Sequence, residues 1–242
     1  MSVTVSLDAT GRYFATFLCT DVPTKDTPAT DRKVGIDLGV ETLATLSDGR
    51  KIGNPRHLKK YERKLAREQR RLSRRKGTRR GEKPSGRYLK QRKWVARIHA
   101  KIADARTDTL HKVTTMLADE NQVLCMEDLN AKGMMRNCHL AKAVSDASFG
   151  EFARLLEYKC AERGRTLVRV GRFYPSSKTC SGCGHRLDAL PLSVRSWDCP
   201  TCGAHHDRDV NAARNILTEG KRILSNTEGT AGHAGTVAAI TA

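Results

Sequence analysis

The chain has 242 residues, enough for one hydrophobic core with small insertions. Its 44 lysines and arginines exceed its 26 acidic residues, and the net charge of +18 predicts a polyanionic partner, with nucleic acid favoured over an anionic membrane surface. No apolar run approaches the roughly 20 residues of a membrane helix, and the N-terminus lacks the apolar core of a signal peptide. We therefore expect a cytoplasmic, nucleoid-associated protein without a membrane partner or a small-molecule ligand.

Strand-like patterns occupy the first fifty residues. Residues 2–7 and 13–18 flank a short turn that contains glycine, which indicates a β-hairpin. Residues 33–39 and 42–46 read as two further strands, and the Ser-Asp-Gly turn at 47–49 leads the chain back. These segments predict the first strands of an α/β core, preceded by a separate hairpin.

Asp37 is the acidic residue of this region with a possible chemical role. Gly35, Asp37 and Gly39 share one face of the strand at 33–39, and the apolar residues share the other face. Glycines on both sides would let a metal ion and a phosphate backbone approach the carboxylate. The same pattern also suits an aspartate at a turn or a sheet edge, so by itself it is a weak signal.

The positive charge is concentrated between Arg50 and Lys112, where 24 basic residues accompany five acidic ones. Two stretches in this segment carry apolar residues at heptad-like spacing, and the Gly- and Pro-containing stretch at 76–86 is predicted to be a flexible loop between them. An antiparallel helical hairpin with outward-facing arginines and lysines would contact nucleic acid, although a hairpin that is merely charged and soluble is the alternative. The expected stripes are Leu58, Tyr61, Leu65 and Leu72, and Val95, Ile98, Ile102, Ala105 and Thr109.

An apolar run at 123–129 follows the basic segment and ends in Glu127 and Asp128. Its composition predicts a buried strand, and sites in open α/β sheets form beyond the carboxyl ends of such strands. Glu127 is therefore a candidate ligand, but both acids could equally mark the exit of the strand to solvent. A helix at 149–163 and a strand at 167–170 complete the predicted core.

Four cysteines are spaced as two CxxC pairs separated by 15 residues: Cys180, Cys183, Cys199 and Cys202. Each pair can present two thiolates to one tetrahedral ion, so this spacing predicts a zinc ribbon. His185, His205 and His206 are interpreted as polar neighbours because four thiolates already complete the ion's shell. The scattered cysteines at 19, 125, 138 and 160 are interpreted as small thiols without chemistry.

A helix is predicted at 209–217, and Asp209 could serve there as a simple N-cap. Together with Asp37 and Glu127, however, it gives three acids in three separate segments. Three convergent carboxylates are what a two-metal phosphodiester nuclease needs, because hard divalent ions require oxygen ligands. Spacing alone does not show that the three converge. The tail from about Lys221 is rich in Thr, Gly and Ala and is predicted to be disordered.

Four ordered segments together resemble the TnpB (OrfB) family, whose members are encoded by prokaryotic insertion sequences and are similar to type V CRISPR effector nucleases. The segments are Gly35-Ile36-Asp37-Leu38-Gly39, Glu127-Asp128-Leu129-Asn130, the stretch from Tyr174 to Gly184, and Asp207-Arg208-Asp209-Val210-Asn211-Ala212-Ala213. The resemblance implies an α/β RNase-H-like (RuvC) core, split by a basic helical hairpin and carrying an inserted zinc ribbon. It also implies cleavage of DNA directed by a guide RNA.

The resemblance also assigns roles to single positions. Asp37, Glu127 and Asp209 match the family's catalytic acids and would be magnesium ligands. The four cysteines match its structural zinc ligands. The basic hairpin would follow the backbones of guide and target through charge and shape. The residues expected to contact nucleic acid are Arg63, Arg67, Arg70, Arg71, Arg74, Arg75 and Lys178.

The resemblance further predicts the order of the parts. Residues 1–30 would be the residual hairpin of a wedge-like domain, so the chain resembles an N-terminally truncated member of the family. The expected function is that of a magnesium-dependent DNA endonuclease, with a non-catalytic nucleic-acid-binding regulator or a decayed remnant as the alternative. A DNA-strand transferase is a weaker third possibility. The remaining parts would be RuvC-like segments at 31–53, 119–179 and 203–220, the basic hairpin at 54–118, the zinc ribbon at 180–202 and the tail at 221–242.

Overall fold

The computed structural model describes residues 2–20, 27–76 and 83–228, and the chain divides into two compact units. The first unit draws on residues 1–24 and 56–109, and the second on residues 25–55 and 110–242. Most of the predicted loop at 76–86 lies outside the described residues. Within the described ranges, no helix has the length and the apolar character needed to cross a membrane.

The first unit contains the predicted hairpin, formed by β1 (Ser2–Leu7) and β2 (Tyr13–Leu18) in antiparallel register. Asp8 organises the turn, because its carboxylate accepts hydrogen bonds from the backbone amides of Thr10 and Arg12 at 2.8 and 2.9 Å. Gly11 has a φ of 84°, which other residues rarely adopt. Every residue of both strands is exposed, so the local turn and the strand pairing define this hairpin.

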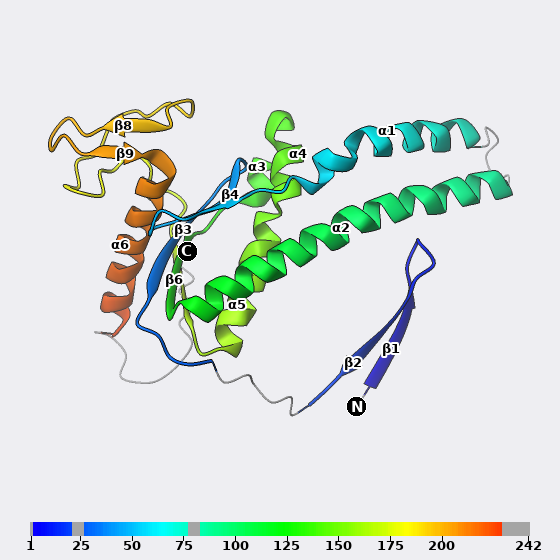
Figure 1. Cartoon of the computed structure of the whole chain (residues 1–242), viewed down its shortest axis with the longest axis horizontal. Coiled ribbons are helices and arrows are strands. Elements are labelled where there is room, and N and C mark those ends of the chain that lie inside the picture. Colours follow the sequence, from blue (N-terminus) through cyan, green and yellow to red (C-terminus); the bar gives the residue numbers. More distant parts are fainter. Residues whose placement is uncertain (1, 21–26, 77–82, 229–242) are drawn as a thin grey trace. The chain divides into compact units, whose positions relative to one another are not determined.

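Two helices form the rest of this unit: α1 (His57–Arg75) and the first two thirds of α2 (Gly86–Glu120). Figure 1 shows them running side by side in opposite directions. The apolar residues at heptad-like spacing meet between them, and the arginines of α1 remain exposed. The shared cluster consists of Leu58, Tyr61, Leu65, Leu72, Val95, Ile98 and Ile102.

Glu68 is a buried carboxylate within this basic helix pair. It accepts a hydrogen bond from Gln91 Nε2 at 3.0 Å, and Arg67 and Arg71 lie 3.1 and 3.0 Å from it. The hydrogen bond from Gln91 is the main cause that lowers the pKa of Glu68, and the two arginines lower it further against the cost of desolvation. The charged form of Glu68 therefore stabilises the folded helix pair.

We expect Glu68→Gln to reduce the melting temperature at pH 7. A carboxyl whose pKa is lowered by folding stabilises the fold above its unfolded pKa of about 4.5, and this contribution is lost as the pH falls through the lower, folded value. The gap in melting temperature between wild type and variant should therefore close progressively below about pH 4.5. The melting temperatures of wild type and variant are measured by circular dichroism between pH 7 and pH 2. A difference in melting temperature that does not change with pH would contradict the argument.

The second unit is built on a five-stranded mixed sheet with the order β5-β4-β3-β6-β7. β3 pairs antiparallel with β4, which pairs antiparallel with β5, whereas β6 runs parallel to both β3 and β7. The predicted strands at 33–39, 42–46, 123–129 and 167–170 all lie in this sheet, which confirms a mixed α/β fold. The bounds are β3 (Lys33–Leu38), β4 (Thr42–Leu46), β5 (Lys51–Gly53), β6 (Val123–Glu127) and β7 (Thr166–Val170).

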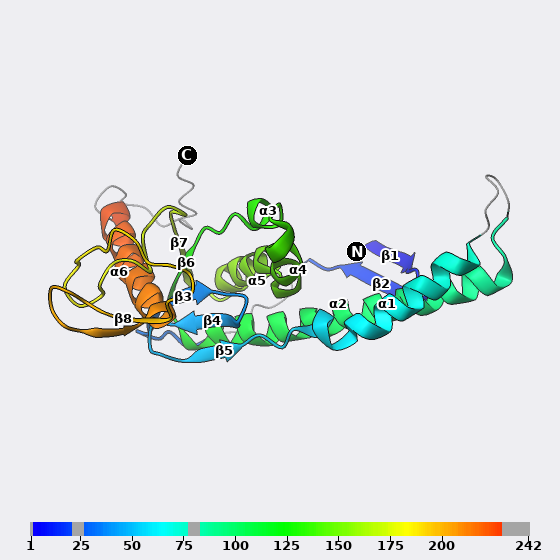
Figure 2. The same cartoon turned by 90° about the horizontal axis from the view of Figure 1, so that it is seen from above.

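Helices cover both faces of this sheet, with α6 (Arg208–Glu228) on one face and α5 (Phe149–Glu162) on the other (Figures 1 and 2). The α5 face holds the larger core, which includes Ile36, Met126 and Phe152. The smaller core under α6 is formed by alternate residues of β6 and β7 with Ile216. Each face has its own core because successive residues of a strand point to opposite faces of the sheet.

The last part of α2 corrects the predicted extent of the basic hairpin. Leu110, Leu117 and Ala118 belong to the core of the second unit, although the hairpin was expected to extend to residue 118. Lys159 of α5 is buried there and donates hydrogen bonds to the carbonyl of His111 and to the hydroxyls of Thr114 and Thr115. One continuous helix therefore serves both units.

The start of the predicted tail also requires correction. The helix α6 continues to Glu228, so residues 221–228 are helical. Ile223 and Leu224 pack against the smaller core, which gives this stretch a buried face. Residues 229–242 of the predicted tail lie outside the described part of the chain.

Gly35 allows α6 to approach the sheet closely. A Cβ atom at this position would lie 2.0 Å from the carbonyl oxygen of Ala213. We expect Gly35→Ala to lower the free energy of unfolding by about 3 kcal/mol, because the backbone of the helix would have to move. The matched control is Gly53→Ala in the same sheet, where no atom lies within 4 Å of the added methyl group. Urea unfolding of both variants tests this, and equal stability would contradict it.

Candidate metal sites

The pairing of β3 with β6 brings Asp37 and Glu127 to the same level of the sheet. Ile36 is paired with Met126 in parallel register, so Asp37 and Glu127 follow at the next position of two adjacent strands. Both side chains lie on the α6 face, because Gly35 contacts α6 and Asp37 is two residues further along the strand. Two carboxylates from segments 90 residues apart in the sequence are thus neighbours.

The electrostatics of Asp37 involve both other predicted acids. Burial raises the pKa of Asp37 well above its usual range, and the charges of Glu127 and Asp209 raise it further. Among the described residues, none donates a hydrogen bond or forms an ion pair with the Asp37 carboxylate. Burial also raises the pKa of Glu127, against the opposing effect of a hydrogen bond from Ser176. The positive charge of Arg208 opposes the raised pKa of Asp37, but in the described part of the chain no cation pairs directly with this carboxylate, so the group suits a bound cation.

Asp209 lies in the first turn of α6, but it does not cap the helix. The carboxylate of Asp207 accepts hydrogen bonds from the amides of Asp209 and Val210 at 3.2 and 3.1 Å, and it pairs with Lys51 at 2.7 Å. The cation near the Asp209 carboxylate is the guanidinium of Arg195, whose Nη1 atom lies 4.0 Å from Asp209 Oδ1. The capping role considered for Asp209 is therefore filled by Asp207, which leaves the Asp209 carboxylate available for a ligand.

Asp128 has different surroundings from Glu127, although the two are adjacent in the sequence. Its carboxylate pairs with Arg172 at 2.6 Å and lies 3.9 Å from Arg169. Asp128 is thus neutralised by protein cations, whereas the half-buried Glu127 accepts its hydrogen bond from an uncharged hydroxyl. Glu127 is therefore a better candidate for a metal ligand than Asp128.

The four cysteines form a compact cluster, and their sulfur atoms all lie within 4.8 Å of one another. The Sγ atoms of Cys180 and Cys202 are 3.7 Å apart, and those of Cys183 and Cys199 are 3.6 Å apart. Tetrahedral coordination with metal–sulfur distances of about 2.3 Å places sulfurs about 3.8 Å apart, so the cluster fits a thiolate-bound metal ion such as zinc. In the described part of the chain, no other group of three or more His, Cys, Asp or Glu ligand atoms is this compact.

The backbone around the cysteines explains this geometry. The second cysteine of each pair is followed by glycine, and Gly184 and Gly203 have φ values of 79° and 70°. This left-handed conformation closes a tight turn, in which the amides of Gly184 and Gly203 donate to the carbonyls of Cys180 and Cys199. The short strands β8 (Ser196–Asp198) and β9 (His205–Asp207) pair beside the second turn and connect it to α6.

The neighbouring histidines make contacts of other kinds. His206 is buried, with its Nε2 atom 3.0 Å from Cys180 Sγ and its ring against that of Trp197. His205 pairs with Asp198 at 2.7 Å. The cluster that fits a metal consists of the cysteines, and His206 can donate a hydrogen bond to a thiolate.

The three acids are less compact than the cysteines, since their ligand oxygens do not all lie within 4.8 Å of one another. The acids therefore do not form a single compact ligand shell like that of the cysteines. Of the three acids, Asp37 is the one whose pKa is raised by the charges of both others. The residue types suit magnesium, which binds through few carboxylates and keeps several waters.

The predicted nucleic-acid contacts of α1 lie on its exposed surface. In the described part of the chain no acidic residue pairs with Arg63 or Arg70, whereas Arg67 and Arg71 contact Glu68. Lys178 lies in the second unit and donates to the carbonyl of Asp188 at 2.8 Å. The remaining members of the set, Arg74 and Arg75, are exposed near the end of the helix.

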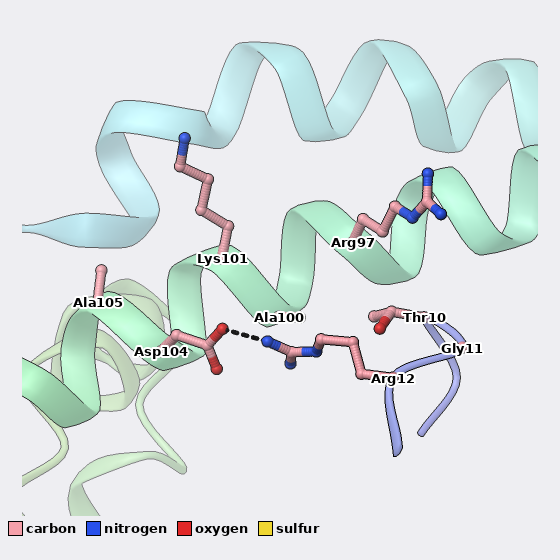
Figure 3. A pocket seen from close by; sticks show the side chains of 8 residues that line it. All are labelled: Thr10, Gly11, Arg12, Arg97, Ala100, Lys101, Asp104 and Ala105. Carbon is pink, nitrogen blue, oxygen red and sulfur yellow. Dashed lines mark hydrogen bonds and ion pairs between the residues drawn. The ribbon is translucent and has the colours of Figure 1, made fainter. Parts of the chain in front are cut away.

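A pocket of about 470 Å³ lies in the first unit, between the turn of the hairpin and α2 (Figure 3). Arg12, Arg97 and Lys101 line it, and Arg12 pairs with Asp104 at 2.7 Å. Lys101 also lies over the ring of Tyr61, with its Nζ atom 5.5 Å from the ring centre. The pocket adds positive charge to the first unit but holds none of the predicted site residues.

Three buried polar residues near these sites were not singled out from the sequence. Ser176 donates a hydrogen bond to Glu127 Oε1, and Asn211 and Asn215 bind the backbone of the segment that contains Ser176. Asn211 lies in the Asn-Ala-Ala stretch that follows Asp209, and this stretch is part of the family resemblance, so Asn211 could have been found from the sequence. No local pattern distinguished Ser176 from Ser177.

Comparison with known proteins places these features in a family. Residues 17–138 match the OrfB_IS605 family, described as a probable transposase, and residues 149–216 match the TNB domain of the Cas12f1-like family. The chain is similar to the "Putative RNA-guided DNA endonuclease" of Streptomyces pristinaespiralis, with 50% identity over 219 residues that cover 90% of this chain and 52% of that protein. It is also similar to the "Putative RNA-guided DNA endonuclease InsQ" of Escherichia coli (strain K12), with 34% identity over 239 residues, 93% of this chain and 58% of that protein.

A solved structure shares the fold. The cryo-EM structure of a Cas12f1-sgRNA-target DNA complex matches with a TM-score of 0.53 at 19% sequence identity, covering 85% of this chain and 52% of that chain. The mixed sheet and the cysteine cluster thus define an α/β protein with a Cas12f1-like fold and four clustered cysteines whose spacing fits a metal ion. The chain belongs to the OrfB (TnpB) family of transposon-associated proteins, which confirms the resemblance in its sequence. It spans about half the length of the curated relatives it matches.

Proposed function

We propose that this chain carries the catalytic part of a metal-dependent DNA endonuclease with an RNase-H-like (RuvC) core, normally guided by RNA. The observation that carries the proposal is that Asp37 and Glu127 stand at the same level of two adjacent strands, on the sheet face covered by α6, whose first turn contains Asp209. The acids come from β3, β6 and the start of α6, elements that the sheet pairing and Gly35 hold together. The names of the relatives support DNA as the substrate and RNA as the guide.

The chain's own residues supply ligands and local order in this proposal. Asp37, Glu127 and Asp209 would hold two magnesium ions, which when bound activate a water nucleophile and stabilise the leaving oxygen of a phosphodiester. Asp37 and Glu127 must lose their protons before they bind a cation, and their raised pKa values make cation binding weaker in acid. Activity should therefore fall as the pH is lowered.

The four cysteines would hold zinc in a structural role, since all four coordination positions are filled by thiolates. The segment from Ser176 to Asp207 then depends on the ion for its fold. Its two short strands, one isolated bridge and two tight turns bury little apolar surface of their own. The ion would take no part in bond cleavage.

The first unit would contact nucleic-acid backbones through charge. Exposed arginines of α1 face away from the apolar stripe, and Glu68 holds two of them in defined positions. Contacts with phosphates orient a nucleic acid without reading its sequence, which suits a protein whose specificity comes from a paired guide. Binding of this kind should weaken steeply with added salt.

The test is a cleavage assay on the full chain. Single-stranded and R-loop DNA are incubated with the protein, with and without Mg²⁺ and with and without the RNA that co-purifies, and wild type is compared with Asp37→Ala. We expect cutting that requires Mg²⁺ and is lost in the variant. Cutting that is equal in wild type and variant would contradict the assignment of Asp37.

The second candidate is a non-catalytic nucleic-acid-binding protein built on the same fold. The excess of basic residues between Arg50 and Lys112 favours it independently of the acids. Binding without any cutting, unaffected by Asp37→Ala, would support this reading. A defined RNA from the element's own transcript among the bound nucleic acids would indicate guide capture, and random host RNA would indicate binding by charge alone.

A further inference from the structure

Ser176 holds the side chain of Glu127. Its hydroxyl donates a hydrogen bond to Glu127 Oε1, and Ser176 is 7% exposed. No other residue in the described part of the chain donates a hydrogen bond to this carboxylate. One oxygen of Glu127 is thus fixed by the protein, and the other remains available.

Two asparagines of α6 hold the segment that contains Ser176. The Nδ2 atom of Asn215 donates to the carbonyls of Ser176 and Thr179 at 2.7 and 2.6 Å. The Nδ2 atom of Asn211 donates to the same carbonyls at 3.5 and 2.7 Å, and its Oδ1 atom accepts from the amide of Ser181 at 2.9 Å. The two asparagines are only 1% and 4% exposed, so their amide groups cannot exchange these partners for water.

The positions of these asparagines on α6 connect the two sites. Asn211 and Asn215 are one helical turn apart and therefore lie on the same face, shortly after Asp209. The segment they hold, residues 176–181, contains both the partner of Glu127 and the first cysteine of the metal cluster. A single helix thereby sets the placement of Asp209, of Ser176 and of Cys180.

We propose that Ser176 is a positioning residue for Glu127, and that Asn211 and Asn215 are positioning residues that act through Ser176. This inference rests on the proposed function, because Glu127 is a metal ligand only if the acids form a metal site. Residues that orient a metal ligand through a hydrogen bond commonly change metal affinity or activity by about 10- to 100-fold when they are replaced. The hydrogen bond from Ser176 already restricts the orientation of the Glu127 side chain. Glu127 therefore loses less conformational freedom when an ion binds.

The first experiment measures Mn²⁺ binding by electron paramagnetic resonance, on zinc-loaded protein without substrate. Binding that disappears in Asp37→Asn defines the acidic site. We expect Ser176→Ala to weaken this binding by about 10-fold. Ser176→Thr, which keeps a hydroxyl, should restore most of the affinity. The matched control is Ser177→Ala, because the neighbouring hydroxyl makes no hydrogen bond with the described residues and its loss should leave Mn²⁺ binding unchanged.

A double-mutant cycle tests whether the asparagines act through Ser176. Asn215→Ala alone should weaken Mn²⁺ binding, whereas in the Ser176→Ala background it should add little, because the hydroxyl that it positions is already missing. Equal effects of Asn215→Ala in both backgrounds would contradict the connection. The absorption of Co²⁺ bound to the cysteines is recorded for each variant, and its retention shows that the cysteine cluster is still folded.

The outcomes separate this inference from the proposed function. Wild-type binding of Mn²⁺ that Asp37→Asn abolishes, with equal affinity in Ser176→Ala, Ser177→Ala and wild type, would overturn the role of Ser176 and leave the proposed function standing. A wild-type protein that binds no Mn²⁺ at an Asp37-dependent site would overturn both. Rescue by Ser176→Thr combined with non-additivity of Asn215→Ala is the result that we expect.

Discussion

Asp37→Asn is expected to abolish metal-dependent cleavage and, without metal, to make the protein more stable. The loss of activity should be about 10³-fold or more, because the charge stabilisation from a bound ion amounts to several kcal/mol and about 4 kcal/mol corresponds to three powers of ten. The gain in stability follows from burial and from the charges of Glu127 and Asp209, which raise the pKa of Asp37. It should be of the order of 1 kcal/mol.

The pH dependence of this stability gain has a definite sign. A carboxyl whose pKa is raised by folding costs stability as the pH rises above its unfolded value of 3.8, and the cost becomes complete above its folded value. The difference in melting temperature between Asp37→Asn and wild type in EDTA should therefore widen as the pH rises from about 3.8. Added Mg²⁺ should close the difference, because the ion stabilises only the wild type. Lower stability of the variant in EDTA at neutral pH would contradict the argument.

Two neighbouring acids provide the matched control. Glu127→Gln should lose cleavage as Asp37→Asn does. Asp128→Asn should retain cleavage within a few-fold, because Asp128 is paired with Arg172 and Arg169 instead of being available to an ion. Equal losses in Glu127→Gln and Asp128→Asn would show that this part of the strand is sensitive to any loss of charge and would remove the support for Glu127 as a ligand.

Cys199→Ser should release the bound metal and unfold the segment around the cysteine cluster. Structural zinc contributes about 10–16 kcal/mol of binding energy in small zinc-dependent domains, and the small cluster around Trp197 could not replace it. We expect the metal content to fall well below one ion per chain and hydrogen exchange to increase between residues 176 and 207. Mass spectrometry of the native protein and hydrogen exchange measure both effects.

The control for the metal site is Cys138→Ser, which removes an exposed thiol from the same unit but outside the cluster. It should leave the metal content and the exchange pattern as in wild type. Because Asn211 and Asn215 hold the segment next to Cys180, loss of the metal should also weaken Mn²⁺ binding at the acids. Full metal content in Cys199→Ser would exclude the cysteines as a four-ligand site.

Many of the strands, in the hairpin and in the five-stranded sheet, were predictable because they have local patterns. The predicted segments 2–7, 13–18 and 42–46 agree with the observed strands at both ends. Alternation of apolar residues depends only on neighbours in the sequence, and so does the spacing that places cysteines on tight turns. The end of the basic hairpin was wrong because helical periodicity does not show against which partner a helix packs. The last turns of α2 continue the same period into a different core.

The sequence by itself determined the family, the four cysteines that cluster and the identity of the candidate acids, since each lies in a short segment with its own pattern. Only the tertiary structure decided that Asp207 caps α6 while Asp209 stays available, and that Ser176 holds Glu127. It also brought Asn211 and Asn215 against the backbone beside the first cysteine. The physical reason is that a buried polar group acquires its role from the partner that replaces water, and the partners of Ser176 and Asn215 are 49 and 39 residues away in the chain.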